Sequence, residues 1–263
     1  MALDEVLMAA ARGGTLTLRL YGWDPPCLSF GRNQAARGRY DPEEAGRRHI
    51  DVVRRPTGGR AVYHDREITY CVTAPVGLWG GLREGYTRIN QALGRGLRSL
   101  GVPLDEPLAR RSARQPRAAR GARPARAPRP VARACFRDPL PGEITSAGRK
   151  LIGSAQWRLD GALLQHGSIL LYDDQVVVDD LMVQARRRAA SGAAAHTPST
   201  GACSLHELLG ELPSEPAVVA ALRRGFEEEI DIPSELDEWT SREMRKAQRL
   251  VARYEDPAWT WRR

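Results

Sequence analysis

The sequence lacks any long hydrophobic run. Of its 263 residues, 42% are hydrophobic and only 6% aromatic, and no stretch reaches the roughly 20 consecutive apolar residues that span a bilayer. The N-terminus also lacks the basic, apolar and small-residue order of a signal peptide. We therefore expect a cytoplasmic protein with no membrane association and with one sizeable core or at most two small ones.

Cysteine is scarce as well. The four cysteines form no CxxC pair, which excludes a disulfide framework and a zinc ribbon, so each is interpreted as a lone thiol. Two of them, Cys71 inside an alternating strand and Cys203 just before a helix, are typical of small core or surface residues. The remaining two are Cys27, which follows two prolines in a turn, and Cys135.

Lysine is nearly absent, because the 40 basic residues include only two lysines. The net charge of +8 comes from one segment: residues 109–134 hold nine arginines and no acid, and the rest of the chain carries 31 basic against 32 acidic residues. This Arg, Ala and Pro composition predicts a disordered loop or linker. The near-neutral remainder has no aromatic and basic interleaving, which argues against a specific nucleic-acid partner.

Hydrophobic periodicity predicts an α+β fold with local strand pairing. The pattern contains no internal repeat, and Thr240 with Glu243 has the spacing of a capping box. We expect helices at 2–12, 84–100, 204–209, 215–230 and 240–254, and strands at 15–21, 50–54, 66–73, 143–146, 150–158 and 162–172.

Three stretches carry residues suited to chemistry. In RRPTGGRAVYHD (54–65), adjacent glycines let backbone N–H groups approach a ligand, although such a turn is often purely structural. In GRKLIGSAQ (148–156), Lys150 is either a compact functional charge or a surface lysine at the start of a strand. In LLQHGSILL (163–171), His166 is either a functional group or a satisfied core histidine.

Together with MALDE (1–5), YGWDPPCLSFGRNQ (21–34) and the tail EDPAWTWRR, these stretches resemble the biotin/lipoate ligase and octanoyltransferase superfamily. RRPTGGRAVYHDREITYCV looks like its cysteine-dependent octanoyltransferase branch. In ACFRDPLPGEITSAGRKLIGSAQ, Cys135 and Lys150 match the Cys-Phe and Gly-Arg-Lys motifs of that branch. The resemblance implies one biotin/lipoate-ligase type catalytic domain over 1–263, a mixed or antiparallel sheet packed with helices, interrupted at 109–134.

The resemblance also implies an activity, octanoyl transfer in lipoate biosynthesis of the Gram-positive type. Cys135 would take the acyl group from octanoyl-acyl carrier protein as a thioester, and a lysine of a lipoyl domain or of glycine-cleavage H protein would then receive it. A nearby ammonium favours the thiolate, since a free thiol has a pKa of about 8.5, and Lys150 would supply that charge. No metal or cofactor is implied, and we expect a monomer. The implied substrate-binding residues are Arg54, Arg55, Thr57, Gly58, Gly59, His64, Gly153, Ser154, Ala155, His166 and Gly167.

Two other activities stay open within the same superfamily. An ATP-dependent lipoate-protein ligase would share the fold and Lys150 but would not need Cys135. An octanoyl or lipoyl amidotransferase would use the same cysteine and take its acyl group from H protein.

Overall fold

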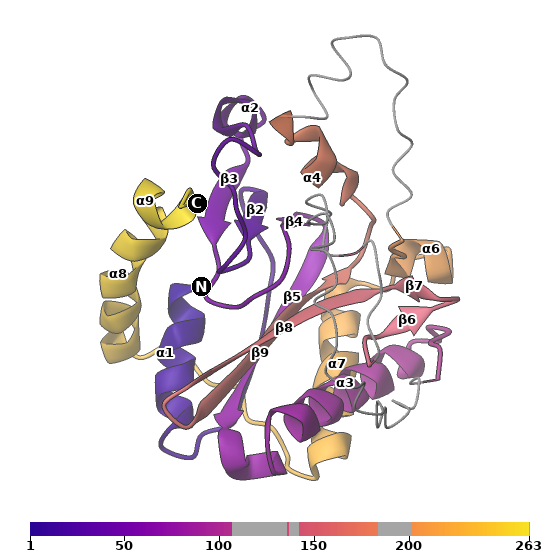
Figure 1. The fold of residues 1–263 in the computed structure, drawn as a ribbon. Coiled ribbons are helices and arrows are strands. Elements are labelled where there is room, and N and C mark those ends of the chain that lie inside the picture. Colours follow the sequence, from indigo (N-terminus) through magenta and orange to yellow (C-terminus); the bar gives the residue numbers. More distant parts are fainter. Residues whose placement is uncertain (107–135, 137–141, 184–200, 263) are drawn as a thin grey trace, which may run out of the picture.

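The main sheet has four antiparallel strands in the order β1-β5-β9-β8 (Figure 1). The computed structural model describes residues 1–106, 136, 142–183 and 201–262, so the expected disordered segment 109–134 and Cys135 lie outside the described residues. The strands are β1 (Thr17–Tyr21), β5 (Glu67–Pro75), β9 (Ala162–Leu170) and β8 (Ile152–Leu159).

Two long helices cover one face of this sheet, α3 (Leu82–Ser99) and α7 (Glu215–Ile230). Helix α3 buries Ile89, Leu93 and Leu97, whose spacing places them on one side of an α-helix. The two helix backbones approach closely, because a Cβ on Gly225 would lie 2.5 Å from the backbone nitrogen of Gly96. Only glycine fits at this crossing.

The two ends of the chain meet on the opposite side of the molecule (Figure 1). Helix α1 (Ala2–Ala11) packs against β5, β9 and helix α8 (Ser241–Glu255). Arg253 and Tyr254 of α8 both contact the carboxylate of Glu5 in α1. The C-terminal helix therefore holds α1 in place beside the sheet.

A second, three-stranded sheet has the order β3-β2-β4, with one parallel and one antiparallel pair. Its core includes Phe30, Tyr40 and Leu181. The strands are β2 (Cys27–Phe30), β3 (Asp51–Arg54) and β4 (Val62–His64), flanked by α2 (Pro42–Arg47), α4 (Val176–Asp180) and α9 (Pro257–Thr260). The remaining elements are η1 (Val76–Trp79), the hairpin β6 (Thr145–Ser146) with β7 (Arg149–Lys150), and α6 (Leu205–Leu209).

The expected α+β class is confirmed, as are all five expected helices and the capping box of Thr240 with Glu243. The expected strand 150–158 is divided, because Lys150 pairs with Thr145 in one hairpin whereas Ile152 pairs with Ile169 in the main sheet. Strand β2 was not predicted: it is buried on both faces, so its sequence shows no alternation.

In the part of the chain that the structure describes, no helix combines the length and the apolarity that crossing a membrane requires.

Candidate active site

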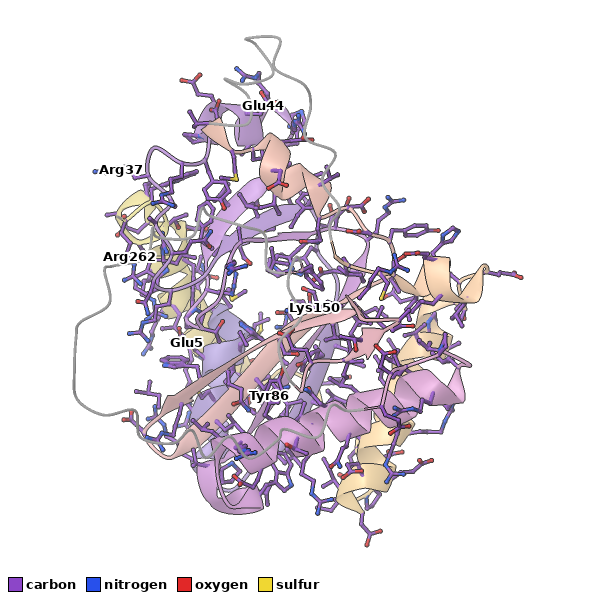
Figure 2. All side chains as sticks on the ribbon, turned by 45° about the vertical axis from the view of Figure 1, so that its right-hand side comes forward. Glu5, Arg37, Glu44, Tyr86, Lys150 and Arg262 are labelled. Carbon is purple, nitrogen blue, oxygen red and sulfur yellow. The ribbon has the colours of Figure 1, made fainter. Side chains whose placement is uncertain are left out.

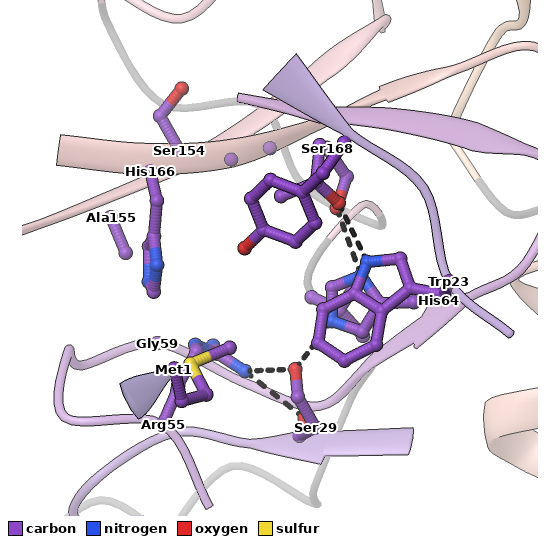
Figure 3. A pocket seen from close by; sticks show the side chains of 15 residues that line it. Met1, Trp23, Ser29, Arg55, Gly59, His64, Ser154, Ala155, His166 and Ser168 are labelled. Atoms are coloured by element: carbon purple, nitrogen blue, oxygen red, sulfur yellow. Dashed lines mark hydrogen bonds between the residues drawn. The ribbon is translucent and has the colours of Figure 1, made fainter. Parts of the chain in front are cut away.

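A small cavity of about 40 Å³ lies between the two sheets, below the usual 300–1,000 Å³ of small-molecule sites. Figure 3 shows His166 and Ala155 projecting from one wall toward Arg55 and Met1 on the other. Ser154 also borders the cavity, but its hydroxyl points away from it (Figure 3) and accepts a hydrogen bond from Tyr70. The lining residues are Met1, Tyr21, Trp23, Ser29, Arg55, Gly59, Val62, His64, Thr69, Gly153, Ser154, Ala155, His166, Gly167 and Ser168.

His64 is held by contacts on both ring nitrogens. Its Nδ1 lies 2.7 Å from Glu67 Oε1, and its Nε2 lies 2.7 Å from Ser29 Oγ. Trp23 stacks on the imidazole at 4.5 Å and donates from its indole nitrogen to Thr69, which in turn donates to Glu67. All of these groups except Trp23 are buried.

His166 has a parallel arrangement on the opposite wall. Its Nε2 lies 2.7 Å from Thr57 Oγ1, and its Nδ1 lies 3.4 Å from Asp4 Oδ2. Burial lowers the pKa of His166, so the imidazole is neutral at neutral pH. Burial raises the pKa of Asp4, but the N-terminal charge, His166 and Arg19 outweigh it and keep the pKa below its usual value.

The two expected arginines have different surroundings. Arg55 borders the cavity and donates to the backbone oxygen and the hydroxyl of Ser29, both at 3.0 Å. Arg54 does not line the cavity: it is fully buried. Its guanidinium donates to the backbone oxygens of Gly31, Arg32, Gln34, Trp259, Thr260 and Arg262.

The Gly-Gly turn also separates into two environments. Gly59 lines the cavity with a φ of 99°, and a Cβ there would lie 2.7 Å from the Arg55 guanidinium. Gly58 is exposed with open space around it. Thr57 reaches the cavity only through His166.

Lys150 is buried beside the cavity rather than in its lining. Its Nζ donates to Glu143 Oε1 at 2.7 Å and lies 5.4 Å from the centre of the Phe136 ring. Figure 2 shows Lys150 among the strands, above helix α3, which carries Tyr86. Phe136 is fully buried, and a Cβ on Gly153 would lie 2.8 Å from its ring, so this ring connects Lys150 with the cavity wall.

Gly167 provides a close approach between strands, because a Cβ there would lie 2.2 Å from the backbone oxygen of Gly153 and 2.8 Å from the Tyr70 ring. A larger residue at this position would separate β8 from β9. The small residues 153, 155 and 167 therefore shape the cavity wall.

The three described cysteines are buried. Burial raises the pKa of all three thiols, for Cys203 to about 11 and for Cys27 and Cys71 further. The thiolate is the nucleophilic form, so these thiols are inert at neutral pH.

Sequence reasoning missed several members of the site. In the motif at 54–65 the neighbour of His64 is Asp65, but the carboxylate that contacts the imidazole is that of Glu67. The spacing of His64 and Glu67 was a usable signal, since residues three apart around a tight bend can face each other. Nothing in the local sequence, however, favours Glu67 over Asp65 as the partner of His64. Asp4, Ser29 and Trp23 were likewise not assigned, because their partners are distant in the chain. Glu143 was also not assigned, although its partner Lys150 is only seven residues away.

Comparison with known proteins gives the family. Residues 1–227 match the model of the lipoyl protein ligase A/B catalytic domain. The chain belongs to this family. Among its relatives, an octanoyltransferase LipM from Kyrpidia tusciae is 40% identical and one from Moorella thermoacetica 36% identical, each match covering 100% of this chain and 94% or 93% of the relative.

Solved structures agree on the family's fold. A lipoate-protein ligase A bound with ATP matches with a TM-score of 0.73 and 23% identity over 99% of this chain and 92% of its own. A bi-partite lipoate protein ligase studied with its E2 lipoyl domain, from Thermoplasma acidophilum, matches with a TM-score of 0.71 and 22% identity over 99% and 89%. The expected biotin/lipoate-ligase type fold is therefore confirmed.

Proposed function

We propose that this protein is an octanoyltransferase of lipoate biosynthesis that works through a thioester on Cys135. The observation that carries this proposal is the similarity over the whole chain to octanoyltransferases LipM. The donor is octanoyl-acyl carrier protein, and the acceptor is a lysine of a lipoyl domain or of glycine-cleavage H protein. We also propose that residues 1–263 act as one catalytic domain and as a monomer.

The first step is acylation of Cys135. Its thiolate attacks the donor thioester, a new S–C bond forms, and the donor sulfur leaves and takes up a proton. In the second step the acceptor amine attacks the Cys135 thioester, an amide forms, and the cysteine sulfur is released.

The position of Phe136 supports the role of Cys135. Phe136 directly follows Cys135 in the sequence, and its ring packs on the cavity wall at Gly153. The same ring lies 5.4 Å from the Lys150 ammonium.

Lys150 is suited to stabilise negative charge in both steps. An ammonium is costly to bury without a counter-ion, and Glu143 supplies one at 2.7 Å. In our proposal this ion pair holds the ammonium in place, where it favours the Cys135 thiolate and the oxyanion of each tetrahedral intermediate.

In our proposal the octanoyl chain binds at this cavity, which widens to admit it. The glycines at 153 and 167 and the alanine at 155 add little side-chain volume to the wall that carries His166. Arg55 and Gly59 would contact the acyl group from the other sheet, and the imidazoles of His64 and His166 border it. Thr57, Gly58, Arg54 and Ser154 would act on this binding site through their neighbours.

Intact-mass spectrometry tests the proposal. The protein mixed with octanoyl-acyl carrier protein should gain one octanoyl group that hydroxylamine removes. Cys135→Ser should abolish this gain, whereas Cys203→Ser, a matched thiol control, should retain it. A wild-type protein that stays unmodified and transfers octanoate only with ATP would refute the proposal in favour of the ligase; acylation by octanoyl-H protein instead of the acyl carrier protein would indicate the amidotransferase.

A further inference from the structure

A continuous array of polar groups runs from Glu67 through His64 to Ser29 at the cavity. The two links are both 2.7 Å long. Glu67 Oε1 also accepts from Ser168 at 2.8 Å and from Thr69 at 2.5 Å. Strands of both sheets contribute to this array, since Glu67 lies in β5 and the other two members lie in β4 and β2.

The contacts define where the protons lie. A carboxylate only accepts hydrogen bonds, so Nδ1 of His64 carries the hydrogen that faces Glu67, and in the neutral imidazole Nε2 keeps its lone pair. The Ser29 hydroxyl donates to that lone pair. Its oxygen also accepts from the Arg55 guanidinium at 3.0 Å. The array therefore has the hydroxyl, imidazole and carboxylate order that moves protons in acyl-transfer enzymes.

The surroundings keep this array aligned and shielded from water. Trp23 covers the imidazole, and the side chains of Ser29, His64 and Glu67 are buried. Within the described residues, Glu67 Oε2 has no hydrogen-bond partner, although buried polar atoms usually have one. The titratable and charged groups that face His64 from the packed elements are Glu67, Arg55, Cys27, Tyr21 and, across the cavity, His166.

The transfer step needs a proton acceptor. An ordinary lysine amine has a pKa of about 10.4, so only about one in 2,500 is neutral at pH 7, and the amine loses protons as the amide forms. Ser29 and His64 line the same cavity as Gly153, against which Phe136 packs.

We propose that Ser29, His64 and Glu67 form a proton relay in which His64 is the general base for acyl transfer to the acceptor lysine. The relay rests on the proposed function. The neutral form of the amine attacks: as the N–C bond forms and the C–S bond to Cys135 breaks, an amine proton passes to Ser29 Oγ and the Ser29 proton passes to His64 Nε2. The imidazolium, stabilised by Glu67, then returns the proton to the released cysteine sulfur.

Single-turnover transfer from the preformed octanoyl-enzyme to a lipoyl domain, measured from pH 5.5 to 9, tests the relay. His64→Gln should slow transfer by about 100-fold, the lower range for general-base catalysis, and should change the shape of the pH profile, because another group must then accept the proton. Glu67→Gln should also change the shape of the profile, because the imidazolium loses its anion, and Ser29→Ala should slow transfer with the profile shaped as in wild type. His206→Gln is the control, since this exposed histidine stacks on Tyr172 much as His64 stacks on Trp23.

The outcomes separate the relay from the proposed function. If wild-type protein transfers the octanoyl group but His64→Gln keeps the wild-type pH profile, His64 has only a structural role and the relay is wrong. If His64→Gln does not fold, a wild-type pH profile in Glu67→Gln overturns the relay in the same way. If the wild-type protein forms no octanoyl-enzyme, both proposals fail together.

Discussion

Replacing Gly153 by alanine should disturb the site through Phe136. The added Cβ would lie 2.8 Å from Cζ and 3.0 Å from Cε2 of the ring, whereas carbon atoms normally pack at about 3.5–4.0 Å. The ring must therefore move by about 0.7–1.2 Å, the difference between these distances. Phe136 is fully buried against Val62, Leu170 and Ala202, so it cannot move without cost.

The expected magnitudes follow from this displacement. Overpacking of this kind destabilises a fold by about 1–3 kcal/mol, and a misplacement of about 1 Å near reacting groups can cost about 100-fold in rate. Urea unfolding followed by tryptophan fluorescence measures the first effect, and the rate of octanoyl attachment to the enzyme measures the second.

Two further variants make this prediction specific. Gly77→Ala, a control with no atom within 4 Å of the added Cβ, should leave both quantities near wild type. Phe136→Leu should restore part of the lost stability and rate in the Gly153→Ala background, since the clash is with the ring. The reasoning is refuted if Gly153→Ala behaves like Gly77→Ala, or if the double variant shows no coupling.

Three further expectations concern stability and thiol reactivity. Arg54→Lys should lower the free energy of unfolding by about 3 kcal/mol or more, because a lysine cannot satisfy all the carbonyls that this buried guanidinium contacts. The C-terminal tail of this variant should also be proteolysed faster than in wild type. A free energy of unfolding equal to that of wild type would contradict this expectation. His166 has a lowered pKa in the folded state, so the unfolded chain binds more protons than the folded protein below about pH 6.5. The free energy of unfolding should therefore decrease as the pH drops below that value, by up to about 1.4 kcal/mol per pH unit. His166→Gln should remove this contribution when urea unfolding at pH 5.5 is compared with urea unfolding at pH 7.5. Maleimide at pH 7 should label one thiol, Cys135, in the folded protein and four after denaturation; rapid labelling of a second thiol in the folded protein would show that burial does not protect the other cysteines.

Local pattern predicted those elements whose environment is uniform along their length. Helix α3 presents one apolar face to the sheet, so its 3.6-residue periodicity is visible in the sequence. Strand β4 has only three residues, too few to show any period, and β7 is separated from β8 by a change of partner that no local pattern records.

The candidate site was predicted only in part, because a local motif does not record which distant residues its side chains contact. The motif at 54–65 located Arg55, Gly59 and His64, all of which line the cavity. It also drew in Arg54, whose guanidinium instead holds the C-terminal turn more than 200 residues away. Adjacent residues in a strand point to opposite sides, so neighbouring arginines in one motif contact different parts of the molecule.

The sequence by itself determined the α+β class, the main helices and the resemblance that led to the family, because periodicity, capping and motif spacing are properties of short segments. Only the tertiary structure decided which acid contacts His64 and which residues meet at the cavity. Ser29, His64 and Glu67 come together because β2 pairs with β4 in one sheet while β5 lies in the other. Such contacts depend on the registers and packing of distant strands, which the sequence of any one strand does not contain.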